Sequence, residues 1–306
     1  MWFRNLQLFH LKSGFDVSAE QLEQALSGQS FQPCGSLQAE SMGWVPPLGS
    51  ETTALVHAVQ GRLLVCARRE ERLLPASVVR EEVDERAAAI EAAEGRTVGR
   101  KERNQIRDEV EMTLLPRAFT RSRHVFAYID PAAGWLIVDA ASRKRAEDIT
   151  VLLRESLGSF AVVPPVTVQP PLAVLTHWLQ EGGTDDFDLG DECELRDESD
   201  EGGVIRCRKL AIDDDEILAH VRAGKRVSRL ALHFGERLSC VLGDDLSIKR
   251  LKFLDMVQDA AAEVEAEGHA ARMDADFVLM AAELAPFLDA VVAGFGGLQP
   301  DAVAAP

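Results

Sequence analysis

The sequence has few of the residues and patterns that mark disulfide-bonded or zinc-binding proteins. Its 306 residues include five cysteines, which are Cys34, Cys66, Cys193, Cys207 and Cys240. They are far apart, odd in number and without a C-x-x-C pair, which excludes the usual zinc and dithiol motifs. We therefore expect reduced thiols, most of them buried.

Long apolar runs are also missing. No stretch of about 18 continuous apolar residues occurs, and residues 1–12, MWFRNLQLFHLK, alternate apolar with polar side chains. A signal peptide would be continuously apolar there. This pattern predicts a soluble protein that stays in the cytoplasm and has no membrane partner.

The motifs of common enzymes are absent as well. Gly224-Lys225 is followed by Arg226, so there is no P-loop, and neither H-E-x-x-H nor G-x-S-x-G occurs. Neighbouring acids at 213–215, at 244–245 and at Asp274 with Asp276 could hold magnesium in a nuclease. A helix cap, a hairpin turn and a helix start explain these acids more simply.

What the sequence does have is an uneven distribution of charge. The formal net charge is −17, with −10 over residues 181–201 and −8 over residues 255–289, so the other 250 residues sum to +1. The acidity of the whole chain argues against nucleic acid as a partner. Its concentration in two segments leaves room for a basic surface elsewhere.

The basic residues of this nearly neutral remainder come in clumps. The clumps are Arg68, Arg69 and Arg72; Arg100, Lys101 and Arg103; Arg117, Arg121 and Arg123; Arg143, Lys144 and Arg145; Arg206, Arg208 and Lys209; Arg222, Lys225, Arg226 and Arg229; and Lys249, Arg250 and Lys252. Their segregation from the acids permits one basic and one acidic surface. Scattered, solvated charges are the alternative.

One clump lies in the stretch LLPRAFTRSRH, residues 114–124. If the chain is extended after Pro116, then Arg117, Phe119, Arg121 and Arg123 point to one side, because alternate residues of a strand share a face. Phe119 could pack in the core, insert between base pairs or dock on a partner subunit. We prefer docking, because insertion between base pairs would require kinking a bound DNA duplex, whereas docking requires no such deformation.

Apolar periodicity and turn residues place the secondary structure. Strand-like runs cover 2–11, 54–59, 62–69, 124–130, 135–140 and 203–210, with a three-strand meander over 226–253. Helical patterns cover 18–28, 75–114 with a break at 94–99, 144–157, 213–221 and 255–295. Loops and a proline-rich linker are expected at 42–50, 162–171 and 181–201.

These elements predict an α+β fold. Two β/α repeats, residues 1–74 and 115–170, form a central body, and residues 171–306 form a C-terminal α+β base domain. Residues 75–114 form a helical hairpin whose apolar stripe is narrow, so we expect it to project as an arm with a tip.

Six stretches in order along the chain carry a resemblance to a known family. They are MGWVPPLGS at 42–50, LLPRAF at 114–119, SLGSFAVVP at 156–164, GGVIR at 202–206, IKRLKF at 248–253 and DADFVLM at 274–280. With these stretches the chain resembles the recombination-associated protein RdgC family of proteobacteria over nearly its whole length.

The resemblance implies a non-enzymatic protein that binds double-stranded DNA without sequence preference and needs no cofactor. It implies a horseshoe-shaped subunit that forms a ring-shaped homodimer around DNA, with a basic hole and an acidic exterior. It also implies a role in recombination and replication on the nucleoid, with inhibition of the RecA recombinase through occupation of DNA.

The family's functional positions fall here on Arg117, Phe119, Arg208 and Lys209. Leu210 stands where a polar residue is usual. With the neighbouring clumps, the predicted DNA contacts are Arg68, Arg69, Arg117, Arg121, Arg123, Arg208, Lys209 and Arg226, and the predicted dimer contact is Phe119. The alternatives are a magnesium-dependent nuclease that uses Asp274 and Asp276, and a protein-interaction scaffold that does not bind DNA.

Overall fold

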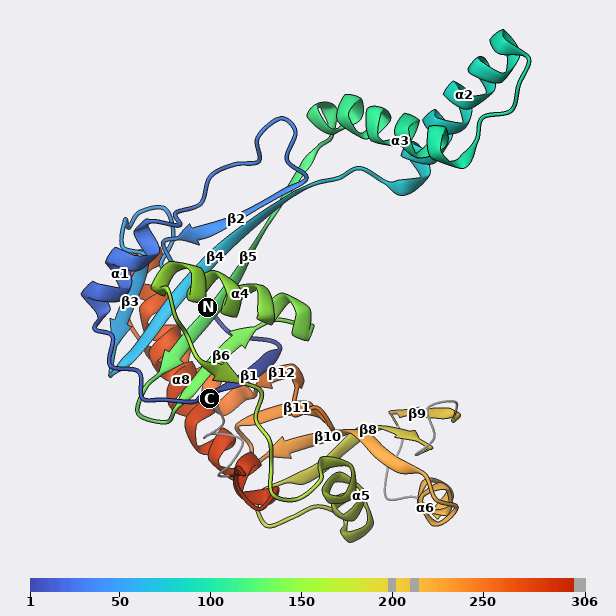
Figure 1. Ribbon diagram of the computed structural model, residues 1–306. Helices are drawn as coiled ribbons and strands as arrows, with labels where there is room; N and C mark the ends of the chain where they lie inside the picture. The colour runs from blue at the N-terminus through green and yellow to red at the C-terminus, as the bar shows by residue number, and fades with distance from the viewer. Residues whose placement is uncertain (198–201, 210–214, 300–306) are drawn as a thin grey trace. The chain divides into compact units, whose positions relative to one another are not determined.

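A computed structural model describes residues 1–197, 202–209 and 215–299. It shows a mixed α+β fold in two compact units (Figure 1). The first unit comprises Met1–Gly28, Pro46–Cys66 and Phe126–Pro306, and the second comprises Gln29–Val45 and Ala67–Val125. The predicted α+β class is therefore confirmed.

Antiparallel strands form the framework of both units. The strands are β1 Leu6–Leu11, β2 Glu40–Val45, β3 Val56–Val59, β4 Arg62–Arg72, β5 Thr120–Asp130, β6 Trp135–Asp139, β7 Val162–Val163, β8 Asp188–Arg196, β9 Val204–Arg208, β10 Arg226–Phe234, β11 Leu238–Gly243 and β12 Ile248–Phe253. Strands β4 and β5 are long enough to contribute residues to both units.

Within the first unit the strand order is β4-β5-β6-β1-β12-β11-β10-β8-β9. Pairs such as Leu8 with Ile137 and Leu230 with Leu242 set the register, and each pair puts two apolar side chains on the buried face. A slip of one residue would turn these side chains to solvent, so burial fixes the register. The predicted hairpin β3–β4 and the meander β10–β12 are both present.

The described part of the chain also contains eight α-helices. They are α1 Ala19–Ser27, α2 Ala76–Glu94, α3 Arg100–Leu114, α4 Arg143–Leu157, α5 Pro171–Glu181, α6 Asp215–Arg222, α7 Asp255–Glu263 and α8 His269–Gly294. The predicted cap at Ser18 opens α1 as a full capping box, in which Gln21 closes the second hydrogen bond.

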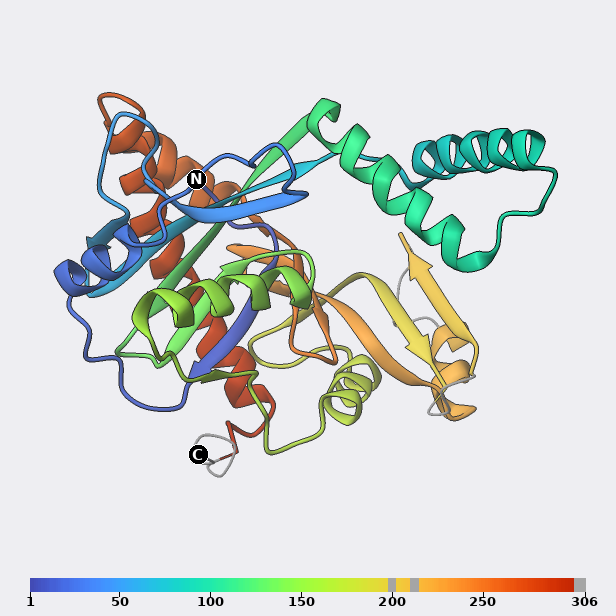
Figure 2. The same cartoon turned by 45° about the horizontal axis from the view of Figure 1, so that its top comes forward.

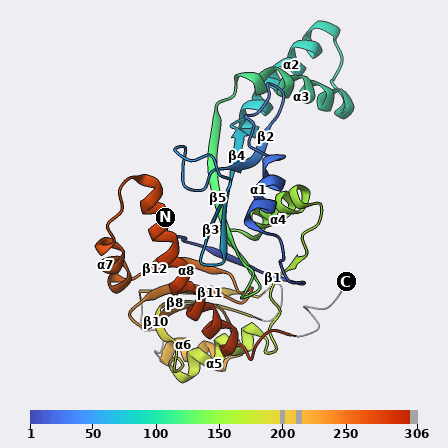
Figure 3. The ribbon, with the colours of Figure 1, turned by 90° about the vertical axis from the view of Figure 1, so that its left-hand side faces the viewer.

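Helix α8 supplies much of the first unit's core. It lies along one face of the sheet, and α4 lies along the other (Figure 3). Its Phe277, Leu284 and Phe287 are buried, and Glu283 forms a salt bridge with Arg237 of the β10–β11 turn. Among the described residues, α8 alone is long and apolar enough to span a membrane. Its packing against the strands identifies it as a core helix.

The second unit combines β2 and the ends of β4 and β5 with the helical pair α2–α3, whose helices lie side by side (Figure 2). The predicted apolar stripe of α2 is present, with Val79, Val83 and Ala87 packed against Ile106 and Val110 of α3. The predicted helical hairpin is thus confirmed, with the break between the helices at 95–99.

The sequence interpretation was wrong at 42–50 and at 181–201, and it did not include helix α5. Residues 42–50 were expected to be a loop, but β2 covers Glu40–Val45, where a Cβ at Gly43 would lie 2.5 Å from the Cα of Phe31. The acidic segment 181–201 was expected to be loops and short elements, but it contains β8, a strand of nine residues. In β8 the acids face outward and apolar residues face the core.

Two cysteines lie opposite each other across β8 and β9. Cys193 and Cys207 are register partners, and both are reduced and buried. Burial, together with the neighbouring Cys207 thiol, raises the pKa of Cys193 to about 12. Of the five cysteines, all unpaired, only Cys34 is not fully buried, which confirms the expectation of buried thiols.

Candidate nucleic-acid interface

In the second unit, the ends of β4 and β5 carry arginines on both faces. On one face, the Nε of Arg121 donates a hydrogen bond of 2.8 Å to Glu71. This hydrogen bond lowers the pKa of Glu71 against the opposing effect of burial, and the charges of Arg121, Arg123 and Arg69 act in the same direction. Arg69 also forms an ion pair with Glu40 of β2, so this face holds three arginines and two carboxylates.

On the opposite face, Arg68 is held in a network. Its guanidinium donates to the Ser122 hydroxyl at 2.9 Å and to Glu70 at 3.2 Å, and lies 4.5 Å from the centre of the Phe31 ring. Glu70 also accepts a hydrogen bond from the Cys34 backbone N–H at 2.9 Å, the largest cause of its lowered pKa. Arg68 thus has partners within the unit.

The LLPRAF stretch is a turn rather than a strand. Residues Leu115–Arg117 form a short 3-10 helix, and Arg72 fixes it by donating to the carbonyls of Leu115 at 3.1 Å and Ala118 at 3.3 Å. The expectation of extended chain directly after Pro116 is therefore wrong, because β5 begins only at Thr120.

The turn leaves Phe119 on the surface. Its side chain is 84% exposed, while its carbonyl accepts a hydrogen bond of 2.7 Å from the Leu73 N–H. Packing of Phe119 in the core of its own subunit is thereby excluded. Arg117 is also exposed, and its guanidinium has no hydrogen-bond or ion-pair partner among the described residues.

In the first unit, Glu192 on β8 bridges two arginines. Arg208 on β9, its register partner, approaches one carboxylate oxygen at 3.2 Å, and Arg250 on β12 approaches the other at 2.5 Å. The carboxylate thus aligns two guanidinium groups from different strands on the face of the sheet that points away from α5 and α8.

Glu194 repeats this arrangement two residues along β8. One of its oxygens accepts from Arg206 on β9 at 2.7 Å and lies 3.3 Å from Arg229 on β10. Burial alone would raise the pKa of Glu194, but the hydrogen bond from Arg206 and the charge of Arg229 outweigh burial and hold it below its usual value. Glu192 and Glu194 are therefore each matched by two arginines.

We call this surface the basic sheet face. Its cations are Arg206, Arg208, Arg229, Arg250 and Lys252, and its carboxylates are Glu192 and Glu194. The face carries an excess of positive charge although the whole chain has a net charge of −17. Of these cations only Arg208 was among the predicted site residues, so the prediction missed Arg206, Arg229, Arg250 and Lys252.

The remaining predicted contacts of the first unit lie at strand ends. Lys209 follows β9 with a φ of 56°, and its N–H donates to the Asp191 carbonyl at 2.8 Å, which turns the chain at this point. Arg226 opens β10 opposite Arg196 and is half-buried. Leu210, where the sequence departs from the family pattern, lies outside the described residues.

The acids proposed for a nuclease have other partners. Asp274 lies 2.6 Å from the Nε2 of His57, and Asp276 binds the Met1 amino group and lies 3.4 Å from Arg272. Within the residues that the structure describes, no three His, Cys, Asp or Glu side chains are grouped so as to hold a metal ion. The acids at 213–214 lie outside those residues.

The chain is thus an α+β protein with arginines on the basic sheet face of the first unit and at the ends of β4 and β5 in the second unit. The chain belongs to the RdgC family. A family model described as "Putative exonuclease, RdgC" matches residues 1–298.

Two curated relatives carry the name recombination-associated protein RdgC. The protein of Aeromonas hydrophila is 46% identical over 97% of this chain and 98% of its own length. That of Tolumonas auensis is 45% identical over 97% of this chain and 99% of its own length. The name they share is not an enzyme name.

Proposed function

We propose that this protein binds double-stranded DNA without reading its sequence and works in recombination and replication. The observation that carries the proposal is the basic sheet face in an otherwise acidic chain. Guanidinium groups on a sheet contact phosphates, which position a protein on a duplex without specifying bases. The name of the curated relatives supports the link to recombination.

We further propose that the protein acts as a ring-shaped homodimer of horseshoe-shaped subunits around the duplex. The exposed Phe119 supports the homodimer, because burying a large apolar side chain against a partner subunit removes it from water. In this proposal the body is 1–74 and 115–170, the helical arm with its tip is 75–114, and the base is 171–306. Bound along the cytoplasmic nucleoid, the dimer antagonises RecA by occupying DNA, with no cofactor.

The first prediction concerns salt. Binding through phosphates releases counterions, so the logarithm of the association constant falls with the logarithm of salt concentration by about 0.9 per phosphate neutralised. Fluorescence anisotropy with labelled duplexes of unrelated sequence, at several salt concentrations, measures this slope. We expect a steep slope shared by all duplexes. A flat response, or no binding to any duplex, supports the scaffold alternative instead.

The exonuclease named in the family description requires a separate test. Incubating the protein with end-labelled DNA and magnesium shows whether strands shorten with time. We expect full-length strands and no catalysis. Shortening that disappears in an Asp274→Asn variant would establish the nuclease alternative.

The second prediction follows from the two carboxylates of the basic sheet face. Glu194 accepts a hydrogen bond from Arg206 and forms an ion pair with Arg229, so a phosphate that binds these arginines must compete with the carboxylate. Glu194→Gln keeps the shape and the acceptor for Ser228 but removes the charge. We expect duplex affinity to rise by roughly tenfold at low salt and the salt slope to steepen by about one.

A matched control tests whether this gain is local. Glu155→Gln on α4 removes the same charge from an exposed position of the same unit. If duplex affinity rises equally in the two variants, the increase results from the change in net charge alone. If Glu194→Gln binds more weakly than the unaltered protein, the carboxylate is needed to hold its arginines.

A further inference from the structure

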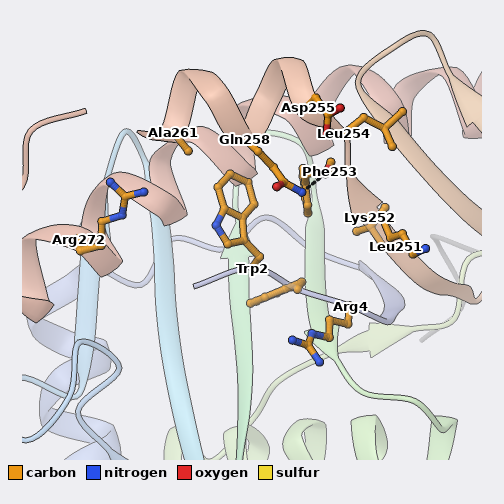
Figure 4. Close-up of a pocket in the computed structure, with 11 residues that line it drawn as sticks. Trp2, Arg4, Leu251, Lys252, Phe253, Leu254, Asp255, Gln258, Ala261 and Arg272 are labelled. Carbon is orange, nitrogen blue, oxygen red and sulfur yellow. Dashed lines mark hydrogen bonds between the residues drawn. The ribbon is translucent and has the colours of Figure 1, made fainter. Parts of the chain in front are cut away.

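A pocket of about 540 Å³ lies between the N-terminal residues, β12 and α7, and shares Lys252 with the basic sheet face (Figure 4). Trp2 forms one wall, and its indole packs against Phe253 at a centroid distance of 4.6 Å. Ala261 of α7 adds an apolar surface. The volume is within the range of about 300–1,000 Å³ that holds compact ligands and side chains.

The rim of this pocket is cationic. Arg4, Lys252 and Arg272 line it, with Asp255 as the lining carboxylate. Arg272 lies 3.4 Å from Asp276, whereas Arg4 and Lys252 form no ion pair with a described residue. The Arg4 charge also acts on Asp139, so a ligand that fills the pocket meets apolar walls and a rim of three cations against the one lining carboxylate of Asp255.

Two exposed apolar side chains lie close in sequence to lining residues of α7. Met256 on α7 is 52% exposed, and Val264, directly after the helix, is 43% exposed. The Val264 carbonyl accepts a hydrogen bond of 3.3 Å from Arg272, which places it next to the rim. Flexible methionine side chains are common on surfaces that bind peptides.

We propose that this pocket binds a partner protein through an acidic peptide segment that inserts one large apolar side chain between Trp2 and α7. Arg4 and Lys252 pair with the flanking carboxylates, and Met256 contacts the neighbouring backbone. An apolar anchor in a pocket surrounded by charge pairs is the usual source of affinity in such complexes.

Charge excludes the chain's own exposed anchor as the occupant. Phe119 is the most exposed large apolar side chain of the described residues, but Arg117, Arg121 and Arg123 surround it in sequence. Cations facing the cationic rim of a second copy would repel it.

The walls also disfavour a nucleotide base. Gln258 is the lining amide, and its Nε2 already donates to the Phe253 carbonyl at 2.6 Å. A base could stack on Trp2 and its phosphate could meet the cations of the rim, but the walls offer few free groups for the polar edge of the base, whereas an apolar side chain needs none.

Fluorescence anisotropy with a short labelled peptide, in which aspartate and glutamate flank a single phenylalanine, tests the proposal. We expect the full-length protein to bind it, and Trp2→Ala and Arg4→Gln each to weaken binding at least tenfold. Arg4 is exposed, so this variant remains informative if Trp2→Ala fails to fold. The matched control, Arg154→Gln on the exposed face of α4, should bind like the unaltered protein.

Two further probes distinguish the occupants. The same peptide with alanine in place of phenylalanine should bind at least tenfold more weakly, and equal binding would overturn the proposal. A labelled oligothymidine that binds in a manner dependent on Arg4 overturns it in favour of nucleic acid. A loss of self-association in Arg4→Gln, seen by sedimentation, overturns it in favour of a second copy.

Discussion

Phe119→Ala should weaken the proposed homodimer by roughly 100-fold to 10,000-fold. Burying a phenylalanine side chain is worth about 1.5–3 kcal/mol, and a two-fold interface uses it twice. Each 1.4 kcal/mol corresponds to about tenfold in affinity. Because the side chain is 84% exposed in the subunit, its removal should leave the stability of the subunit nearly unchanged. Sedimentation velocity over a range of protein concentrations measures the dissociation constant.

A matched control and a second readout complete this experiment. Met112→Ala removes another exposed apolar side chain, 61% exposed, from the same unit and should leave the dimer intact. Arg117→Ala should weaken duplex binding while the dimer persists. A folded Phe119→Ala protein that dimerises normally would contradict the role given to this residue.

The double variant Arg208→Ala with Lys209→Ala should bind every duplex more weakly, by on the order of 10- to 30-fold. Both residues lie at the β9 edge of the basic sheet face, and each lost phosphate contact weakens binding independently of sequence. The salt slope should flatten by about 1.8 for the two contacts. Anisotropy titrations across salt concentrations give both quantities.

The control for total charge is Arg143→Ala with Lys144→Ala, which removes two cations from the start of α4 in the same unit. We expect a much smaller loss of affinity. Equal losses for the two double variants would mean that the β9 residues act only through net charge. An unchanged slope in the β9 variant would remove Arg208 and Lys209 from the contact surface.

Local patterns in the sequence were sufficient to predict most elements. The spacing of Val79, Val83 and Ala87 and the cap at Ser18 both depend on neighbours within a few residues, which sequence displays directly. β8 was missed because its charge hid the alternation of Glu192 and Glu194 with Cys193 and Leu195. That alternation was the signal that could have identified the strand.

The basic sheet face could be predicted only in part. Arg206 and Arg208 were visible as a clump, but Arg229 and Arg250 join them only because β10 and β12 belong to the same sheet. Strand order depends on contacts between distant segments, which a local pattern does not contain. The exposure of Phe119 likewise depends on Arg72, which holds the turn from another strand.

The paired thiols of Cys193 and Cys207 make the β8–β9 edge observable by chemical labelling. Only a thiolate reacts rapidly with an alkylating reagent, and a thiol pKa of about 12 leaves Cys193 almost wholly protonated at neutral pH. Cys193 can therefore be alkylated only after β8 and β9 separate, because its thiol then regains its ordinary pKa. Cys240, buried in β11 with a pKa also raised to about 12, supplies an internal reference for deeper unfolding. The ratio of the two labelling rates therefore measures how often β9, the strand that carries Arg206 and Arg208, separates from β8 relative to unfolding around Cys240.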